Sequence, residues 1–341
     1  MKELKVGIAG LGRLGRVHAQ NLAYHIPGVK LSAACSIVEE ELTFAKKELG
    51  VSEVYTDFDQ MIASDLDAVA IVTTSGMHAK QIESALARGK HVFCEKPLGV
   101  TLEECREAEK AVEAHPDLVF FLGFMRRYDP SYAYAKKKIA EGAIGKPYLV
   151  KATGIDPESA VEGAIRFAPT SGGLFIDMAS HDADLMRWFL GAEAKEVYAL
   201  GSTFKHPEFA ACGDSESGIA MFSFDNGAMG MLHVGRTAPY GYHIETEIVG
   251  TEGTIRVSPV PEKNLAMLYN KDGVVQECVS GFPERFDEAY RLEMQEFIDC
   301  VREGRKPEVT VYDGTRATEM TFATTSAFKN HRIEKIGKDE T

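Results

Sequence analysis

Short runs of apolar residues alternate with helical segments over the first third of the chain. Such runs are typical of strands that are buried on both faces of a sheet. They fall at residues 5–9, 30–35, 54–55, 67–73, 91–95 and 118–123. Helices are expected between them, after a glycine turn at 10–15 and at 42–50, 78–88 and 101–114. This alternation predicts a doubly wound, mostly parallel sheet, which forms a first domain over residues 1–123.

The pattern changes after Gly123. A helix is expected from Phe124 to about Glu141, and strands dominate the remainder of the chain. They are predicted at residues 148–155, 196–204, 216–225, 227–237, 243–250, 253–258 and 265–269. The Asp-Asn-Gly sequence at 225–227 lies between two of them and is a hairpin signal. Residues 124–341 are therefore expected to form a second α/β domain with an open, largely antiparallel sheet. Helices would cover one face of that sheet and a partner subunit the other.

The composition of the 341 residues is that of a globular enzyme, with 45% apolar and 26% charged residues. A net charge of −13 argues against a nucleic acid or an anionic membrane as the main partner. No run approaches the ~18 apolar residues of a membrane span, and the start of the chain predicts a strand instead of a signal peptide. None of the six cysteines forms a C-x-x-C pair, so no zinc cluster is indicated. A cytoplasmic protein without a metal is expected.

A Gly-x-Gly-x-x-Gly sequence follows the first strand and precedes a helix, which is the context that the dinucleotide fingerprint requires. Gly10 makes the tight turn, Gly12 lets the backbone approach a pyrophosphate, and Gly15 lets the helix pack against the strand. Arg13 and Leu14 lie in the same turn, where the N–H groups of the helix start face the phosphates. A glycine turn that binds no ligand is the alternative.

The end of the second strand carries Ser36 where an acidic residue would hold the adenosine ribose. Residues 39–41 are all glutamates, which would repel the 2′-phosphate of NADP. NAD is therefore expected over NADP, although Ser36 could donate to a 2′-phosphate or cap the next helix. Thr73, Thr74 and His78 follow a central strand at its carboxyl end, where the nicotinamide and its ribose would lie. For His78, capping or packing is the alternative.

Glu95, Lys96 and Pro97 end another buried strand. Proline excludes a following central strand and disfavours helix at Lys96, so the backbone turns there. Glu95 and Lys96 are thereby placed at the carboxyl edge of the sheet, where open α/β sheets bind ligands. An ordinary surface lysine in a loop is the alternative.

Asp177 and His181 lie four residues apart in a segment that is expected to be helical from about Leu174. This spacing places both side chains on one helix face. A carboxylate one turn before a histidine can orient the ring and stabilise its cationic form. A surface ion pair is the alternative, and two ligands are too few for a metal site.

Three stretches carry a resemblance to a known family: GIAGLGRLG at the start, HVFCEKPLG in mid-chain and GGLFIDMASHDADLMRWFLG further on. Together they resemble the Gfo/Idh/MocA oxidoreductases, and within them the inositol dehydrogenases. FMRRYDPSY, AIGKPYLV and YGYHIETEIVGTEG extend the resemblance over nearly the whole chain. It implies a Rossmann domain, a second domain whose open sheet is buried in dimers or tetramers, and a catalytic trio of Lys96, Asp177 and His181.

Further site residues follow from the resemblance alone. The inositol enzymes use a Met-Arg pair that matches Met125 and Arg126, and a tyrosine that matches Tyr242. Enzymes for myo-inositol carry histidine at the position of Gly154 and asparagine at that of Asp156, so a different isomer such as scyllo-inositol, or a related polyol or sugar, becomes an alternative. Arg126, Asp156 and Tyr242 are candidates to bind hydroxyl groups, and each could instead be structural.

The implied reaction oxidises a secondary hydroxyl of a cyclic polyol, with hydride transfer to C4 of the nicotinamide of NAD. His181 is the expected base because imidazoles titrate near neutral pH, and Asp177 would hold its ring. Lys96 would stabilise negative charge on the reacting oxygen, or act as the base itself. An aldose or other sugar dehydrogenase of the same family is the first alternative. The second is a dinucleotide-binding regulator without catalysis, and the third is a protein that uses the sheet only for assembly.

Overall fold

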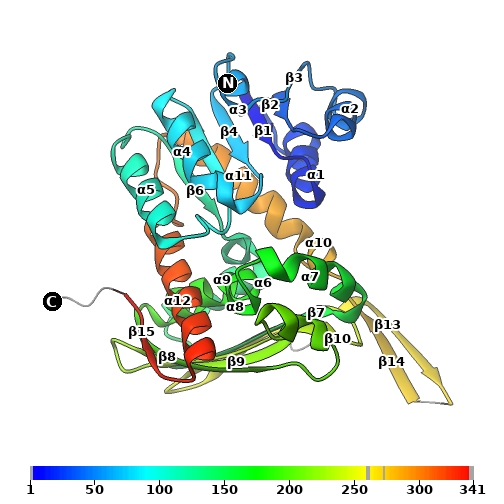
Figure 1. Ribbon diagram of the computed structural model, residues 1–341, viewed down its shortest axis with the longest axis vertical. Coiled ribbons are helices and arrows are strands. Elements are labelled where there is room, and N and C mark those ends of the chain that lie inside the picture. The colour runs from blue at the N-terminus through cyan, green and yellow to red at the C-terminus, as the bar shows by residue number, and fades with distance from the viewer. Residues whose placement is uncertain (1–2, 259–261, 272, 338–341) are drawn as a thin grey trace. The chain divides into compact units, whose positions relative to one another are not determined.

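The computed structural model describes residues 3–258, 262–271 and 273–337. The chain folds into two compact units (Figure 1). The first comprises Met1–Asp129 and Glu288–Thr318, and the second comprises Pro130–Asp287 and Glu319–Thr341. The chain therefore leaves the first unit, builds the second, returns to the first and ends in the second.

A six-stranded sheet forms the centre of the first unit, and every strand in it is parallel to its neighbours. Its strands are β1 (Leu4–Ala9), β2 (Val29–Cys35), β3 (Glu53–Tyr55), β4 (Ala68–Ile71), β5 (His91–Glu95) and β6 (Phe120–Gly123). Their order across the sheet is β3-β2-β1-β4-β5-β6, so the winding reverses between β1 and β4. The predicted doubly wound sheet is confirmed, and its switch point is where such sheets bind ligands.

Helices connect these strands, and polar caps fix where two of them begin. The Asp57 side chain accepts a hydrogen bond from the Gln60 backbone N–H, and Thr101 forms a capping box with Glu104. The helical elements of this unit are α1 (Arg13–Gln20), η1 (Asn21–His25), α2 (Glu39–Glu48), α3 (Phe58–Ile62), η2 (Ser75–Met77), α4 (His78–Ala87), α5 (Leu102–Glu113), η3 (Met125–Tyr128), α11 (Asp287–Glu303) and the first part of α12 (Val311–Asn330).

Helix α11 completes the core of the first unit from far along the chain. Its Met294, Phe297 and Ile298 are buried in the same cluster as the apolar residues of β1 and β5. The Phe297 ring lies 5.8 Å from that of Phe93 and 6.0 Å from that of Phe121. The sequence pattern predicted one boundary at residue 123, because the apolar face of a late helix does not reveal which core it joins.

The second unit contains a seven-stranded sheet of order β12-β11-β7-β10-β9-β8-β15. β7 and β10 run parallel, and every other pair of neighbouring strands in this sheet is antiparallel. The predicted open, largely antiparallel sheet is therefore confirmed. Its strands are β7 (Pro147–Pro157), β8 (Ala194–Ser202), β9 (Ser217–Phe224), β10 (Met229–Ala238), β11 (His243–Gly250), β12 (Thr254–Val257) and β15 (Glu334–Lys335). A separate hairpin pairs β13 (Glu262–Asn270) with β14 (Gly273–Cys278). The predicted turn at 225–227 joins β9 to β10, with Gly227 at a φ of 82°.

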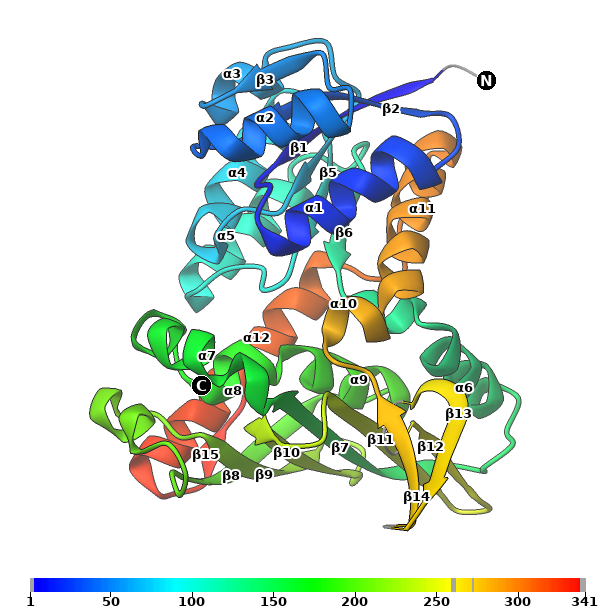
Figure 2. The ribbon, with the colours of Figure 1, turned by 90° about the vertical axis from the view of Figure 1, so that its right-hand side faces the viewer.

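Helices lie on one face of this sheet and leave the other open (Figures 1 and 2). Along β9 the residues alternate, so that Phe222 is buried while Ile219 and Met221 are exposed. The helical elements are α6 (Pro130–Ala140), η4 (Glu158–Ala160), α7 (Val161–Phe167), η5 (Ala168–Thr170), α8 (Leu174–Met178), α9 (Ser180–Leu190), η6 (Pro207–Cys212), α10 (Phe282–Arg285) and the rest of α12.

Two expected helices differ in detail. The one expected from Phe124 starts as the 3₁₀ turn η3, and α6 begins only at Pro130, a residue that suits the first turn of a helix. The one expected from Leu174 is divided at Ala179 into α8 and α9. Asp177 and His181 therefore belong to consecutive helices. Within the described ranges, no helix has both the length and the apolar character that crossing a membrane requires.

Candidate functional site

The glycine turn between β1 and α1 has the geometry that a pyrophosphate needs. Gly10 has a φ of 88°, and its N–H donates to the Cys35 carbonyl at 2.9 Å, which ties the turn to the end of β2. A Cβ on Gly10 would lie 2.3 Å from the Val72 carbonyl oxygen, and one on Gly15 would lie 2.1 Å from the Gly10 carbonyl oxygen. A Cβ on Gly12 would meet no atom closer than a Glu41 oxygen at 4.0 Å. Gly12 alone of the three is therefore free of protein contacts that require glycine, as expected where a ligand approaches the backbone.

This difference predicts opposite effects of two alanine substitutions. Gly15→Ala should destabilise the fold by about 1–3 kcal/mol, because its methyl group overlaps a backbone carbonyl. Gly12→Ala should leave the melting temperature unchanged and weaken NAD binding by about tenfold or more. Thermal unfolding and titration calorimetry measure the two effects. A Gly12→Ala protein that binds NAD normally would contradict the assignment of the turn.

Thr73 and His78 lie beside the carboxyl end of β4, as the sequence predicts. The Thr73 hydroxyl donates to Gln81 Oε1 at 2.6 Å. His78 is buried, with Nδ1 2.7 Å from the Pro97 carbonyl and Nε2 3.1 Å from that of Thr73. Burial lowers the pKa of His78, although the two carbonyl contacts act in the opposite direction. These contacts favour packing, the alternative role for His78, and they link β4 to the Lys96–Pro97 turn.

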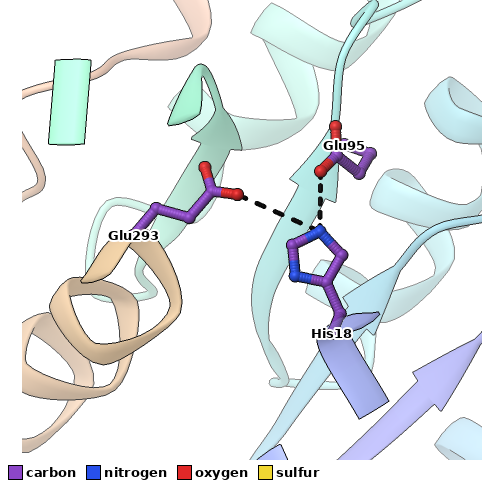
Figure 3. Close-up of side chains that lie close together, drawn as sticks. All are labelled: His18, Glu95 and Glu293. Carbon is purple, nitrogen blue, oxygen red and sulfur yellow. Dashed lines mark hydrogen bonds and ion pairs between the residues drawn. The ribbon is translucent and has the colours of Figure 1, made fainter. Parts of the chain in front are cut away.

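Glu95 ends β5, and its carboxylate links this strand to α1 and to the backbone of Lys96. One oxygen lies 2.7 Å from Nε2 of His18 on α1, and the other accepts from the Lys96 backbone N–H at 3.0 Å. Glu293 of α11 points toward the same histidine, with Oε1 3.9 Å from Nε2 (Figure 3). All three side chains are buried. The sequence predicted Glu95 at this edge of the sheet, but His18 and Glu293 lie in helices whose packing it does not specify.

The spacing in this cluster is that of a hydrogen bond. Ligand atoms that share a zinc-like ion at 2.0–2.2 Å stand roughly 3.4 Å apart, whereas His18 Nε2 and Glu95 Oε1 are 2.7 Å apart. Burial, and then the negative charge of Glu95, raise the pKa of Glu293 well above its ordinary value. Both effects disfavour the charged form of Glu293 beside the His18–Glu95 pair.

The raised pKa of Glu293 predicts a specific pH dependence of stability. Because the folded state keeps a proton that the unfolded chain releases, the free energy of unfolding should fall as the pH rises above the ordinary carboxyl range. The fall is at most about 1.4 kcal/mol per pH unit. Glu293→Gln should remove this contribution, so its stability relative to the wild type should rise between pH 5 and pH 8 in denaturant unfolding. Glu288→Gln, at a carboxylate that is 62% exposed, is the control. Parallel pH profiles for wild type and Glu293→Gln would contradict a raised pKa of Glu293.

Asp177 of α8 is held by an arginine that the sequence pattern does not reveal. Arg236 of β10 is 2% exposed, and its Nη1 donates to Asp177 Oδ2 at 3.0 Å. Nη2 of the same guanidinium lies 4.0 Å from Oδ2 of the buried Asp214. The other oxygen of Asp214 accepts from the Leu174 N–H at 2.8 Å, which fixes the start of α8. A lone arginine in a strand pattern carries no sign of these partners, so only the fold identifies it.

His181 is buried in the first turn of α9, which packs against β7. Gly154 of β7 faces that helix, because a Cβ there would lie 3.3 Å from Asp182 Oδ2. Alternation along β7 directs Asp156 to the same side. Ile244 of β11 pairs with Gly154, and Tyr242, two residues earlier, shares its side and is buried. Asp156, Asp177, His181 and Tyr242 thus belong to the second unit, and they occupy its helix-covered side.

Lys96, Met125 and Arg126 belong to the first unit, with the glycine turn and Ser36. Met125 and Arg126 are buried in η3, directly after β6. Thr74 precedes η2, and Arg13 and Leu14 open α1. The predicted cofactor residues are therefore gathered at the carboxyl ends of the parallel strands of one unit.

Two family models match the chain. One describes an oxidoreductase family with an NAD-binding Rossmann fold and matches residues 4–123. The other describes the GFO/IDH/MocA C-terminal domain and matches residues 132–256. Together they span most of both units.

Named relatives cover nearly the full length of the chain. The scyllo-inositol 2-dehydrogenase (NAD(+)) of Bacillus subtilis (strain 168) is 37% identical, over 96% of this chain and 95% of the relative. A crystal structure of scyllo-inositol dehydrogenase from Lactobacillus casei, with bound NAD(H) and scyllo-inositol, is 44% identical with a TM-score of 0.96, covering 98% of this chain and 99% of that one. A myo-inositol 2-dehydrogenase from Lactobacillus plantarum is 41% identical with a TM-score of 0.96, covering 98% and 100%.

Proposed function

Because the chain belongs to the GFO/IDH/MocA oxidoreductase family, we propose that it oxidises one secondary hydroxyl of scyllo-inositol to the ketone with NAD. It is an NAD-dependent dehydrogenase that acts on CH–OH groups of inositols. The observation that carries the assignment is the full-length similarity to inositol dehydrogenases together with a glycine turn that is open only at Gly12. The preference for the scyllo isomer over other inositols is the more specific part of the proposal.

The cofactor fits the residues of the first unit. When bound, its nicotinamide accepts the hydride that leaves the substrate carbon. Gly10, Gly12 and the first N–H groups of α1 hold the pyrophosphate, since no side chain caps that helix start. Thr73 and Thr74 line the end of β4, where the nicotinamide ribose would be bound.

The residues proposed to remove the hydroxyl proton belong to the second unit. His181 takes the hydroxyl proton, because an imidazole can accept a proton at neutral pH. Asp177 supports the imidazolium that forms, and the Arg236 hydrogen bond at 3.0 Å holds that carboxylate in place. The expectation that Asp177 contacts the His181 ring stays a prediction.

Lys96 stabilises the negative charge that develops on the reacting oxygen. The carboxylate of Glu95 fixes the backbone of Lys96 through the 3.0 Å hydrogen bond to its N–H. Arg126, Asp156 and Tyr242 are the proposed partners of the other ring hydroxyls. Lys96 as the base is the competing assignment, and substitution of His181 separates the two.

The preference for the scyllo isomer rests on Gly154. A larger residue there would press on Asp182, whose Oδ2 stands 3.3 Å from the Cβ position. Asp182 is fully buried, so it has little room to move. The histidine that the resemblance places at this position in myo-inositol enzymes would therefore not fit this chain without rearrangement.

The direct test of the proposal is a substrate panel followed by absorbance of reduced nicotinamide. The purified protein is assayed with scyllo-, myo- and chiro-inositol, glucose and other aldoses, each with NAD and with NADP. The highest kcat/KM is expected for scyllo-inositol with NAD. Turnover of an aldose alone would show that the substrate is an aldose and not an inositol. Binding of NAD without turnover of any compound in the panel would favour a regulator without catalysis.

A second copy of the chain is the proposed partner of the open sheet face. Methionines Met221 and Met231 stand directly opposite each other on β9 and β10, at 57% and 46% exposure. Ile219 and Met229 extend this apolar surface along the same two strands, and both are exposed. Apolar residues in such a row are typical of an interface between subunits. A homo-oligomer, dimer or tetramer, is therefore expected.

A charge in the middle of that surface should break the oligomer. Met221→Glu is expected to give monomers in sedimentation or light scattering, because an unpaired carboxylate would be buried between subunits. Tyr134→Glu, at a similarly exposed aromatic residue on α6, should leave the assembly intact. An unchanged molar mass for Met221→Glu would show that this face is not the interface.

A further inference from the structure

The carboxylate of Glu41 lies beside the residue that follows β2 and faces the glycine turn. β2 ends at Cys35, whose carbonyl accepts from the Gly10 N–H, so the strand end and the glycine turn are adjacent. Ser36 follows and carries no charge, although this is the place where a carboxylate usually meets the ribose. The adjoining turn leads into α2, and Glu41 is in the first turn of that helix.

Ser36 fixes the direction of the Glu41 side chain. Its Oγ accepts from the Val38 N–H at 3.0 Å and donates to Glu41 Oε2 at 2.5 Å. A hydroxyl has one proton to donate, so this proton is committed to Glu41. Ser36 has no carboxylate of its own, but its hydrogen bond holds the carboxylate of Glu41 near the end of β2.

The second oxygen of Glu41 faces the glycine turn. Oε1 lies 4.0 Å from the Cβ position of Gly12, the nearest atom to that position. Within the described part of the chain, Oε1 accepts no hydrogen bond, so its capacity as an acceptor is available. Ile37, the residue after Ser36, is 90% exposed, and its apolar side chain could pack against the face of a purine.

From this geometry we propose that Glu41 accepts hydrogen bonds from the adenosine ribose of NAD, and that it excludes the 2′-phosphate of NADP. Ser36 is its positioning residue. The inference rests on the proposed function only in that the chain uses a nicotinamide dinucleotide. A ribose 2′-hydroxyl donates to Oε1, whereas a phosphate at that position would place negative charge against a carboxylate.

The test measures binding, which needs neither substrate nor turnover. Titration calorimetry with NADH and NADPH gives two dissociation constants for each protein. The wild type should bind NADH about 100-fold or more tightly than NADPH. Glu41→Gln should weaken NADH binding by about 10-fold or more and narrow that ratio, because a charged acceptor is lost. Ser36→Ala should change the ratio in the same direction by a smaller factor, since the carboxylate is still present.

Glu40→Gln is the matched control, because it removes one charge from the same exposed helix start and should leave the ratio unchanged. Equal shifts for Glu40→Gln and Glu41→Gln would overturn the proposal in favour of a general negative field. An unchanged ratio in Glu41→Gln would overturn it while leaving NAD binding, and with it the proposed function, intact. A wild type that binds neither dinucleotide would overturn both.

Discussion

Replacing His181 with alanine is expected to lower kcat on scyllo-inositol by about 10²–10⁴-fold, the range for a lost general base. The dissociation constant for NADH should stay within a factor of about two, because His181 and the glycine turn belong to different units. Steady-state kinetics and calorimetry measure the two quantities separately.

The exposed His25, in the first unit, is the control for His181. His25→Ala should keep normal turnover. Raising the pH should not restore the His181→Ala protein, since the missing group is the base itself. Near-normal turnover of His181→Ala would leave Lys96 as the base and would contradict proton transfer to His181.

Replacing Arg236 with methionine is expected to harm both stability and turnover. The substitution removes the guanidinium from Asp177 and from the buried Asp214, so two carboxylates lose their cation. Breaking a fully buried ion pair costs about 3–5 kcal/mol, and the cost here should be smaller because the Asp177 side chain is 29% exposed. Thermal unfolding should therefore show a large decrease in melting temperature, and kcat should fall with NADH binding unchanged.

Two further variants separate a positioning role from a purely structural one. Asp214→Asn removes the other carboxylate near Arg236 and should lower stability with little effect on kcat. Arg236→Lys keeps the positive charge but loses the planar guanidinium. Compared with Arg236→Met, it should therefore recover more of the melting temperature than of kcat. If Arg236→Met and Asp214→Asn lower kcat equally, Arg236 has no specific effect on Asp177.

The parts of the fold that the sequence predicts are those that local patterns determine. Short apolar runs placed the six strands of the parallel sheet, and the Asp-Asn-Gly sequence placed the turn between β9 and β10. The glycine turn could be recognised because its spacing is that of the dinucleotide fingerprint: Gly10 and Gly15 have no room for a side chain, and Gly12 leaves space for a ligand. Ser36 stands out in the sequence because it replaces an expected acid.

What the sequence could not provide depends on contacts between distant segments. His18, Glu95 and Glu293 come from α1, β5 and α11, and no local pattern connects positions so far apart. Arg236 and Asp177 are separated by 59 residues. The division of the expected helix at Ala179 is likewise a tertiary effect, since helix propensity gives no reason for a break at alanine.

The measurement that tests the central claim most directly tracks the hydride itself. The protein is incubated with NAD and with scyllo-inositol that carries deuterium on its ring carbons, and the reduced cofactor is analysed by mass spectrometry. Hydride transfer from the inositol ring predicts NADH that is one mass unit heavier than that formed from unlabelled substrate, with one ketone per NADH. Absence of NADH, or NADH without deuterium, would contradict the claim that this chain is an inositol dehydrogenase.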